Sequence, residues 1–503
     1  MGRSIMRSKG RAGQVRLLRR LWRYGIVALV ACLIILGVGR QPALATQARH
    51  YTELEFEPLS EIEIPEYSTF RLDNGLQVYL MEDHELPLVS GITLIHTGDR
   101  YEPADKVGLA GVVGSVMRSG GTEAYPADEL NQFLEQRAAS IETGIGTTSG
   151  SASFEALSED LPEVFNRFAD VLRHPAFPQD KIDFTLAQIA GNIARRNDDP
   201  DGILSREFGK LLYGGDSPYA RTVEYSTLES ISREDVVAFY EQYVYPSNML
   251  LGIVGDFNPD TMRQLIEAEF SDWSAAGPAA ELPPVEVNQA NTSGIFLVDQ
   301  PQLSQSYVQL GHIGGTRRDP DYAELSVVNE VLNGLGGRLV NEVRSRQGLA
   351  YVTYAVWSAP YDYPGVFVAG GQTRSDATVP FIELTMAEIE RIREEPIPQD
   401  ELDQARDSVL NSFVFNFQTP GQTLSRVMRY DYYDYPSDFI FQYRQDLMAA
   451  TAQSIQEAAN THLQPEQIVT LVVGNQAEIN PPLQTLDADV TPIDITVPEG
   501  SNP

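Results

Sequence analysis

LVSGITLIHTG, residues 88–98, is the part of the sequence from which the architecture can be inferred, because a second stretch of the same design follows later. That second stretch is SQSYVQLGHIG, residues 304–314. Both alternate apolar and polar side chains as a half-buried β-strand does, and both end on glycine. A shift of 216 residues pairs His96 with His312. An internal repeat of this kind indicates two copies of one structural unit.

The same spacing recurs beyond the two strands. It pairs Leu109 with Leu325 and the glycines at 120–121 with those at 336–337. Near the end of each copy, LGIVGD at 251–256 corresponds to LVVGN at 471–475, with an offset near 219. Both are apolar runs followed by an acidic or amide residue, so each copy is expected to close on a strand and a turn.

Amphipathic stretches lie between these strands. They predict helices over 105–118, 126–138 and 158–173 in the first copy, and over 321–333 and 376–394 in the second. Alternating strands mixed with such helices favour an α+β fold of two homologous lobes, each a mainly antiparallel sheet covered by helices.

Composition sets the expected boundaries. We expect an N-terminal lobe over 55–273 and a C-terminal lobe over 294–480. The segment 274–293 is rich in Ala, Pro, Asn and Ser, which is typical of a linker. Residues 481–503 are rich in Pro, Asp and Thr and are expected to form a flexible tail.

The first 45 residues have the pattern of an export signal. Eight basic residues within 3–23 precede an apolar run from Gly25 to Gly39, and Ala43-Leu44-Ala45 follows as a cleavage site. The prediction is a signal peptide over 1–45, cleaved after Ala45, with a body that lies outside the cytoplasm as a periplasmic or secreted protein. The alternatives are an uncleaved membrane anchor and a lipoprotein site at Cys32.

Charge and cysteine content exclude several classes of function. The formal net charge is −33, and nine of the 37 basic residues lie within 1–45, where no acidic residue occurs. The remaining 28 basic residues face 70 acidic ones, so nucleic acid is not an expected partner. This acidity fits a solvated surface, or attraction of basic peptides. Cys32 is the single cysteine, so disulfides, a thiolate nucleophile and a cysteine-bound metal are not expected in the body.

Several ordered segments carry a resemblance to a known family. They are FRLDNGLQV at 70–78, GLA at 108–110 followed by GGT at 120–122, HPAFP at 174–178, GLGGRL at 334–339, RSRQGLAY at 344–351 and SFVFNFQTP at 412–420. Together they resemble the insulinase/pitrilysin (inverzincin) metallopeptidases, over about residues 60–476. The resemblance implies two lobes that form half of a clam-shell chamber.

The resemblance also implies where zinc would be bound. The family's H-x-x-E-H motif falls on Gly111, Gly114 and Ser115, and its later glutamate ligand falls on Gly191 or Asn192. Glycine offers no ligand atom, and Ser and Asn are poor zinc ligands. No two of the six histidines lie within ten residues of each other, so a zinc site would have to be assembled from distant ones. We therefore expect no metal on this chain.

The second copy retains a pair that the resemblance associates with substrate. Arg344 and Tyr351 correspond to the family's Arg and Tyr, which face the zinc and donate hydrogen bonds to a peptide carbonyl and the oxyanion that forms from it. The alternatives are a surface helix residue for Arg344 and a core aromatic for Tyr351. Gly334, Gly336 and Gly337 correspond to a loop that lies near substrate in the family, or form a turn between helices.

Two functions follow as hypotheses. The first is a catalytically incomplete subunit of an exported zinc peptidase, which binds peptide or unfolded protein and supplies Arg344 and Tyr351 to a zinc-bearing homologue in a heterodimer. The second is a non-enzymatic peptide-binding or structural module of the same fold. A peptidase active on its own through an unrecognised site is a third possibility. In the first case the zinc belongs to the partner, and the membrane is contacted only through the N-terminal signal.

Overall fold

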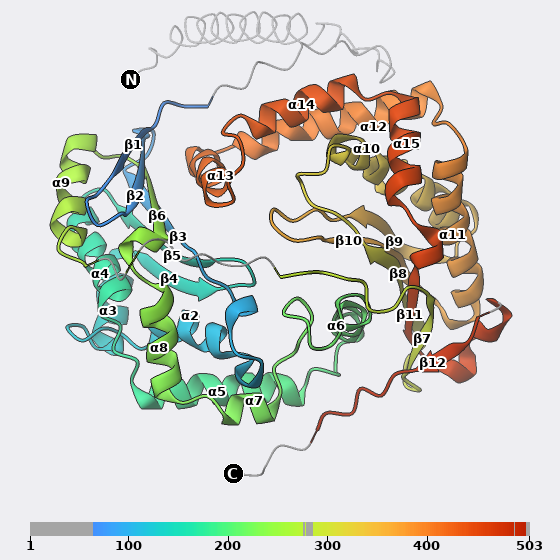
Figure 1. The fold of residues 1–503 in the computed structure, drawn as a ribbon, viewed down its shortest axis with the longest axis horizontal. Coiled ribbons are helices and arrows are strands. Elements are labelled where there is room, and N and C mark those ends of the chain that lie inside the picture. The colour runs from blue at the N-terminus through green and yellow to red at the C-terminus, as the bar shows by residue number, and fades with distance from the viewer. Residues whose placement is uncertain (1–63, 275–276, 278–284, 487, 499–503) are drawn as a thin grey trace, which may run out of the picture. The chain divides into compact units, whose positions relative to one another are not determined.

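The computed structural model describes residues 64–274, 277, 285–486 and 488–498, in which the chain forms two six-stranded sheets (Figure 1). The first sheet has the order β1-β2-β6-β3-β5-β4. Its strands are β1 (Ser68–Arg71), β2 (Gln77–Glu82), β3 (Leu88–Ile95), β4 (Ser140–Ile145), β5 (Gly150–Leu157) and β6 (Met249–Gly255).

The second sheet has the order β12-β7-β11-β8-β10-β9, so β3 and its repeat β8 occupy the same place. Most neighbouring strands are antiparallel, the exceptions being the parallel pairs β2–β6, β7–β11 and β7–β12. The predicted α+β class is therefore confirmed. The strands are β7 (Gly294–Asp299), β8 (Gln305–Ile313), β9 (Ala350–Trp357), β10 (Val366–Arg374), β11 (Val469–Gly474) and β12 (Val490–Pro492).

Helices pack against each sheet through one large apolar cluster in each half of the chain. In the first half, Phe154 on a strand meets Phe165 and Phe168 on a helix, and in the second half Phe367 and Phe381 are fully buried. These helices include all five that the amphipathic stretches in the sequence predicted. They are α2 (Leu109–Ser119), α3 (Ala127–Arg137), α4 (Leu161–Arg173), α5 (Gln179–Ala194), α7 (Tyr225–Glu229), α8 (Arg233–Tyr243), α9 (Pro259–Phe270), α10 (Tyr322–Asn333), α11 (Thr378–Glu394), α12 (Gln399–Ser412), α14 (Phe439–Ala449) and α15 (Ala452–His462).

Two further helices pack against the sheet of the other half. Helix α6 (Pro200–Tyr213) places Phe208 and Leu212 against Leu471 and Val473 of β11. Helix α13 (Pro420–Tyr432) places Met428 against Tyr79 and Leu250 of the first sheet. The two halves therefore bury each other's apolar surfaces, and the described residues belong to one compact unit.

Helices α6 and α13 both begin with a capping side chain followed by proline. Asp199 accepts a hydrogen bond from the backbone N–H of Gly202 at 3.0 Å, and Thr419 accepts one from Gln422 at 3.2 Å. In each case proline is the first helical residue, where its missing N–H costs nothing. The start of each helix thus depends on neighbouring residues, whereas the sheet that each helix packs against lies far away in the sequence.

The C-terminal segment differs from the flexible tail that we expected. Strand β12 pairs in parallel with β7, and Asn197 donates a hydrogen bond to the carbonyl of Ile495 at 2.6 Å. The described part of the expected linker is also bonded in place, since Asn291 donates to the carbonyl of Leu211 at 2.8 Å. Backbone pairing of β12 and these side-chain amide bonds hold the segments despite their polar, proline-rich composition.

The predicted signal peptide over 1–45 lies outside the described residues. In the part of the chain that the structure describes, no helix is both long and apolar enough to cross a membrane.

His312 at the end of β8 is buried in a way that favours its neutral form. Its Nδ1 donates to the carbonyl of Ile313 at 2.8 Å, so its Nε2 accepts the backbone N–H of Gln464 at 3.1 Å. Burial lowers the pKa of His312 below 6.5, and nearby His462 lowers it further, against the opposing effects of the Ile313 bond and Glu466.

We expect this histidine to make stability depend on pH. Below pH 6.5 the unfolded chain binds a proton that native His312 does not, so the free energy of unfolding falls as the pH drops toward the lowered native pKa. Its contribution to the slope reaches at most about 1.4 kcal/mol per pH unit. Urea unfolding between pH 7 and pH 5 should show a shallower slope for His312→Gln than for the unmodified chain. Equal slopes would contradict this.

Candidate functional site

Helix α2 carries the three positions on which the zinc motif falls, with its two ligands at Gly111 and Ser115 and its glutamate base at Gly114. Gly111 and Ser115 are exposed and lie one turn apart, whereas Gly114 is buried against β4. A Cβ atom built on Gly114 would lie 2.5 Å from the backbone nitrogen of Ile145 and 2.9 Å from the Cα of Gly144. Thr143 also donates a hydrogen bond to the Gly114 carbonyl at 2.6 Å. The strand therefore occupies the space that a glutamate side chain would need.

This packing gives a prediction with an internal control. Gly114→Ala should destabilise the chain by about 1–3 kcal/mol, because the added methyl meets backbone that cannot move freely. Gly111→Ala should stabilise it by roughly 0.5–1 kcal/mol, since no atom lies within 4 Å of the new Cβ and alanine favours the helix. Chemical unfolding of both variants tests this. Two variants of equal stability would contradict it.

The N-terminus of α2 is capped by a residue that the sequence did not single out. The carboxylate of Glu102 accepts the backbone N–H groups of Gly108 at 3.0 Å and Ala110 at 2.9 Å. Burial raises the pKa of Glu102, while these two bonds and Arg221, 3.8 Å away, act in the opposite direction. A negative charge at the N-terminus of a helix interacts favourably with the helix dipole and stabilises the helix. An acidic residue shortly before the Gly-Leu-Ala start was the available signal.

The remaining position considered for zinc lies on α5, which packs against α2. Asn192 is exposed, and a Cβ built on its neighbour Gly191 would meet no atom within 4 Å. Across the described ranges, no group of three or more His, Cys, Asp or Glu side chains is arranged to hold a metal ion. The α2–α5 surface is therefore lined with residues that offer no ligand set.

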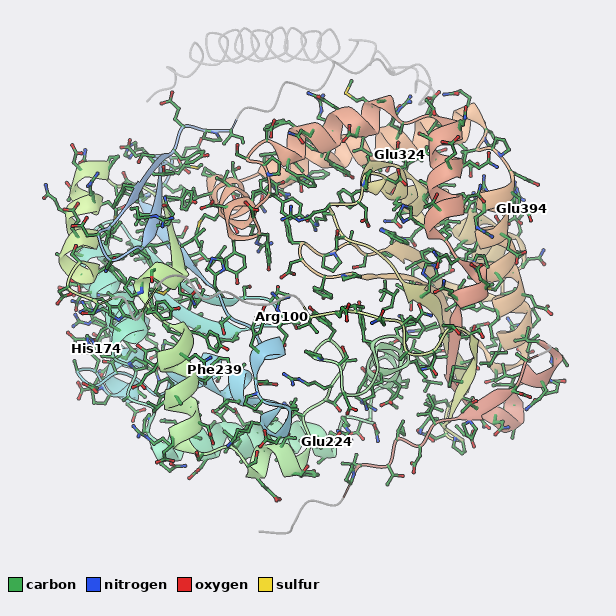
Figure 2. The ribbon with its side chains drawn as sticks, in the orientation of Figure 1. Arg100, His174, Glu224, Phe239, Glu324 and Glu394 are labelled. Carbon is green, nitrogen blue, oxygen red and sulfur yellow. The ribbon has the colours of Figure 1, made fainter. Side chains whose placement is uncertain are left out.

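The histidines within the described residues are scattered and have other roles. His84 and His174 are exposed and pair with Asp256 and Asp170 at 2.7 and 2.8 Å. His174 is labelled in Figure 2. His96 stacks on Tyr432, with ring centroids 4.1 Å apart. His50 lies outside the described residues.

Arg344 and Tyr351 lie together, although seven residues separate them in sequence. Arg344 belongs to a π-helical segment, Val340–Arg346, and Tyr351 lies near the start of β9. The guanidinium carbon of Arg344 is 5.2 Å from the centroid of the Tyr351 ring, a cation–π contact. Tyr351 is 79% exposed. The alternative of a core aromatic is therefore excluded.

The pair presents its donors to solvent. Neither side chain hydrogen-bonds to another described residue, so the guanidinium N–H groups and the phenol O–H are available. π-Helical turns are rare and often occur at functional sites. This one is anchored by the buried Val343, whose carbonyl accepts the N–H of Leu349 at 3.0 Å. Gly348 makes the intervening turn, with φ at +61°.

The glycine-rich segment forms a tight turn after α10. The N–H of Gly334 bonds to the carbonyl of Glu330 at 2.8 Å, and the N–H of Gly337 bonds to the carbonyl of Gly334 at 2.7 Å. Asn341 donates to the carbonyl of Gly336 at 2.7 Å. Leu335 at the tip is fully exposed, at 103%. The segment is thus a bonded helix-to-helix turn with an apolar tip.

A charged contact joins the two halves near their centre. Arg100, in the short 3-10 turn Asp99–Tyr101 that follows β3, pairs with Asp362 of the β9–β10 loop at 2.6 Å, and its side chain is only 8% exposed (Figure 2). Burial alone lowers the pKa of Arg100, but Asp362 and a bond from Arg100 to Tyr219 more than offset this and raise it. Beside the pair, Tyr219 stacks on Tyr363 with centroids 4.3 Å apart.

Known protein families match most of the described chain. Residues 78–214 match the family described as Insulinase (Peptidase family M16), and residues 230–409 match the Peptidase M16 inactive domain.

Individual relatives point the same way. The chain is 24% identical to the "Non-peptidase homolog YmxG" of Helicobacter pylori, over 78% of this chain and 91% of that protein. It is 22% identical to the "Uncharacterized zinc protease YmxG" of Bacillus subtilis, over 71% and 86%.

Solved structures share the fold. The crystal structure of a peptidase M16 inactive domain from Pseudomonas fluorescens superposes with a TM-score of 0.73 at 24% identity, over 81% of this chain and 98% of that one. The periplasmic protease PqqL of Escherichia coli gives a TM-score of 0.70 at 18% identity, over 84% of this chain and 49% of that one.

Proposed function

Because the chain belongs to the insulinase (M16) peptidase family, we propose that it is the zinc-free subunit of a two-subunit metallopeptidase. In this proposal Arg344 and Tyr351 serve an active site whose zinc is bound by a homologous partner subunit. The observation that carries the proposal is the contrast between two surfaces of the chain. Helix α2 offers glycine and serine where ligands would be needed, whereas Arg344 and Tyr351 are adjacent and exposed.

The proposed chemistry follows from the donors. As water attacks a peptide carbonyl, negative charge develops on its oxygen, and preorganised N–H and O–H groups stabilise that charge most in the transition state. The Arg344 guanidinium and the Tyr351 hydroxyl are such donors. Zinc on the partner would polarise the carbonyl and activate the water. The turn at Gly334, Gly336 and Gly337 would lie beside the bound peptide.

The proposed substrate is an extended or unfolded polypeptide outside the cytoplasm. The basic and apolar pattern of residues 1–45 supports export, and the acidic body would attract basic segments of a chain. In the competing proposal, the chain binds peptide or supports an assembly without catalysis. The name given to the Helicobacter pylori relative fits either proposal.

Reconstitution distinguishes the two. The purified chain alone should not cleave an unfolded reporter peptide, and its zinc content should stay far below one per molecule. A zinc-bearing homologue isolated with it from the native source should gain activity strongly when the chain is added. A homologue with full activity alone, unchanged by the chain, would favour the binding module.

A further inference from the structure

Tyr351 is the extra residue of a β-bulge. The ladder between β9 and β10 pairs Gln372 with Val352 and then Thr373 with Ala350, so Tyr351 has no partner on β10. Two residues of β9 thus oppose one position on the neighbouring strand. Such bulges bend a strand and re-aim a side chain, and they are frequent beside active sites.

The bulge accounts for the exposure of Tyr351. In the regular part of β9, Ala355 and Trp357 face the core, and strict alternation would direct residue 351 to the same side. The extra residue reverses the alternation, so that Ala350 is 8% exposed and joins the core while Tyr351 is 79% exposed. Without the bulge, Tyr351 would be directed away from Arg344 and toward the apolar interior.

A buried hydroxyl holds the chain at this point. The Thr373 side chain, 1% exposed, donates a hydrogen bond to the carbonyl of Leu349 at 2.6 Å. The N–H of the same Leu349 bonds to Val343 in the π-helical segment. Leu349 is therefore fixed from both sides, by β10 through Thr373 and by the segment that carries Arg344. One hydrogen bond thereby links the placement of both donors.

The fold does not require the bulge at Tyr351. In the first sheet, the corresponding edge ladder runs from Ser140 opposite Glu155 to Ile145 opposite Gly150 with no shift of register. The order of the five strands β2-β6-β3-β5-β4 in the first sheet is the same as that of β7-β11-β8-β10-β9 in the second. The bulge is therefore a local feature of the half of the chain that carries Arg344 and Tyr351.

We infer that Thr373 is the positioning residue of the Arg344–Tyr351 pair, because its hydroxyl locks the bulge that turns Tyr351 outward. The consequence for catalysis rests on the proposed function. The placement of Tyr351 does not, and it is tested on the chain alone.

The first experiment measures the register directly. In a Cys32→Ser background, Ala350→Cys should react slowly with a charged maleimide, because the thiol is reached only when the register slips. Adding Thr373→Val should speed this reaction about tenfold, the equilibrium effect of losing one buried hydrogen bond. Thr373→Ser keeps the hydroxyl and should restore the slow rate.

The matched control is Thr385→Val. Thr385 is also fully buried in the second half and also donates to a carbonyl, that of Phe381, at 2.7 Å, but it lies in α11 away from the bulge. It should leave the labelling of Ala350→Cys unchanged. Equal labelling rates in the Thr373→Val and Thr385→Val variants would overturn the inference.

The second experiment measures the consequence for the active pair. With the zinc-bearing homologue, Thr373→Val should lower kcat about tenfold to a hundredfold through misplacement of Tyr351, with unchanged affinity between the subunits. Thr373→Ser and Thr385→Val should retain activity. A loss of activity in Tyr351→Phe without any loss in Thr373→Val would overturn the inference. Full activity of Tyr351→Phe would instead refute the proposed function, and the labelling result would still decide the role of Thr373.

Discussion

Arg344→Ala and Tyr351→Phe should each lower the kcat of the reconstituted pair roughly a hundredfold or more. Each change removes a donor aimed at negative charge that exists only in the transition state, and the loss of one such donor typically costs about 3–4 kcal/mol. Steady-state kinetics on an unfolded peptide measure the effect. Because both side chains are exposed and neither is part of the core, folding and complex formation should be unaffected.

A neighbouring arginine provides the control for this test. Arg346 lies in the same π-helical segment, is 70% exposed and pairs with Glu342 instead of Tyr351. Arg346→Ala removes the same charge from the same surface and should change kcat little. If Arg344→Ala and Tyr351→Phe keep full activity, the pair is structural and the binding module becomes the better proposal. If Arg344→Ala and Arg346→Ala lose activity equally while Tyr351→Phe keeps it, general surface charge is responsible.

The sequence predicted the architecture well where the pattern was local and repeated. The alternation at 88–98 and 304–314 became β3 and β8, in equivalent places in two sheets. Apolar periodicity placed α10 and α11 within a few residues of their observed bounds. These features depend on side chains that lie close together in sequence.

Features that depend on distant partners were not predictable. The apolar faces of α6 and α13 show that each helix is buried, but periodicity does not specify which sheet covers it. Strand β12 is a short run with a proline, and only its pairing with β7 makes it a strand. The edge position tolerates that proline, which cannot donate to a ladder.

The sequence suggested which residues form the candidate pair but not how they are placed. The resemblance predicts a functional role for Arg344 and Tyr351, yet alternation along β9 directs Tyr351 inward. The exposed ring requires the bulge opposite Thr373, which no residue pattern predicts. In the same way, glycine at 114 stands where the resemblance places the motif's glutamate base, whereas the backbone of β4, 2.5 Å from where a Cβ at this position would lie, shows that the space is filled.

Asp362→Ala should destabilise the chain by about 3–5 kcal/mol, since it leaves the guanidinium of Arg100 buried without its countercharge. Arg100 is 8% exposed and Asp362 is 24% exposed, so solvent screens this pair little. Chemical unfolding measures the effect. Exchanging both residues for apolar ones, as in Arg100→Met with Asp362→Leu, should restore most of the stability, because no unpaired charge then remains.

A surface pair gives the reference for that value. Arg263 and Glu267 lie one turn apart on α9 at 2.8 Å, with side chains 52% and 42% exposed, and such pairs contribute only about 0.3–0.5 kcal/mol. Glu267→Ala should therefore cost far less than Asp362→Ala, although both remove one carboxylate from an arginine. Equal costs would mean that the Arg100–Asp362 contact is solvated. The free energy of unfolding of Asp362→Ala is to be compared with that of the double apolar variant. If Asp362→Ala lowers this free energy strongly and the double variant restores it, then the burial of an unpaired arginine, and not the lost attraction, is the reason that the two halves depend on this contact.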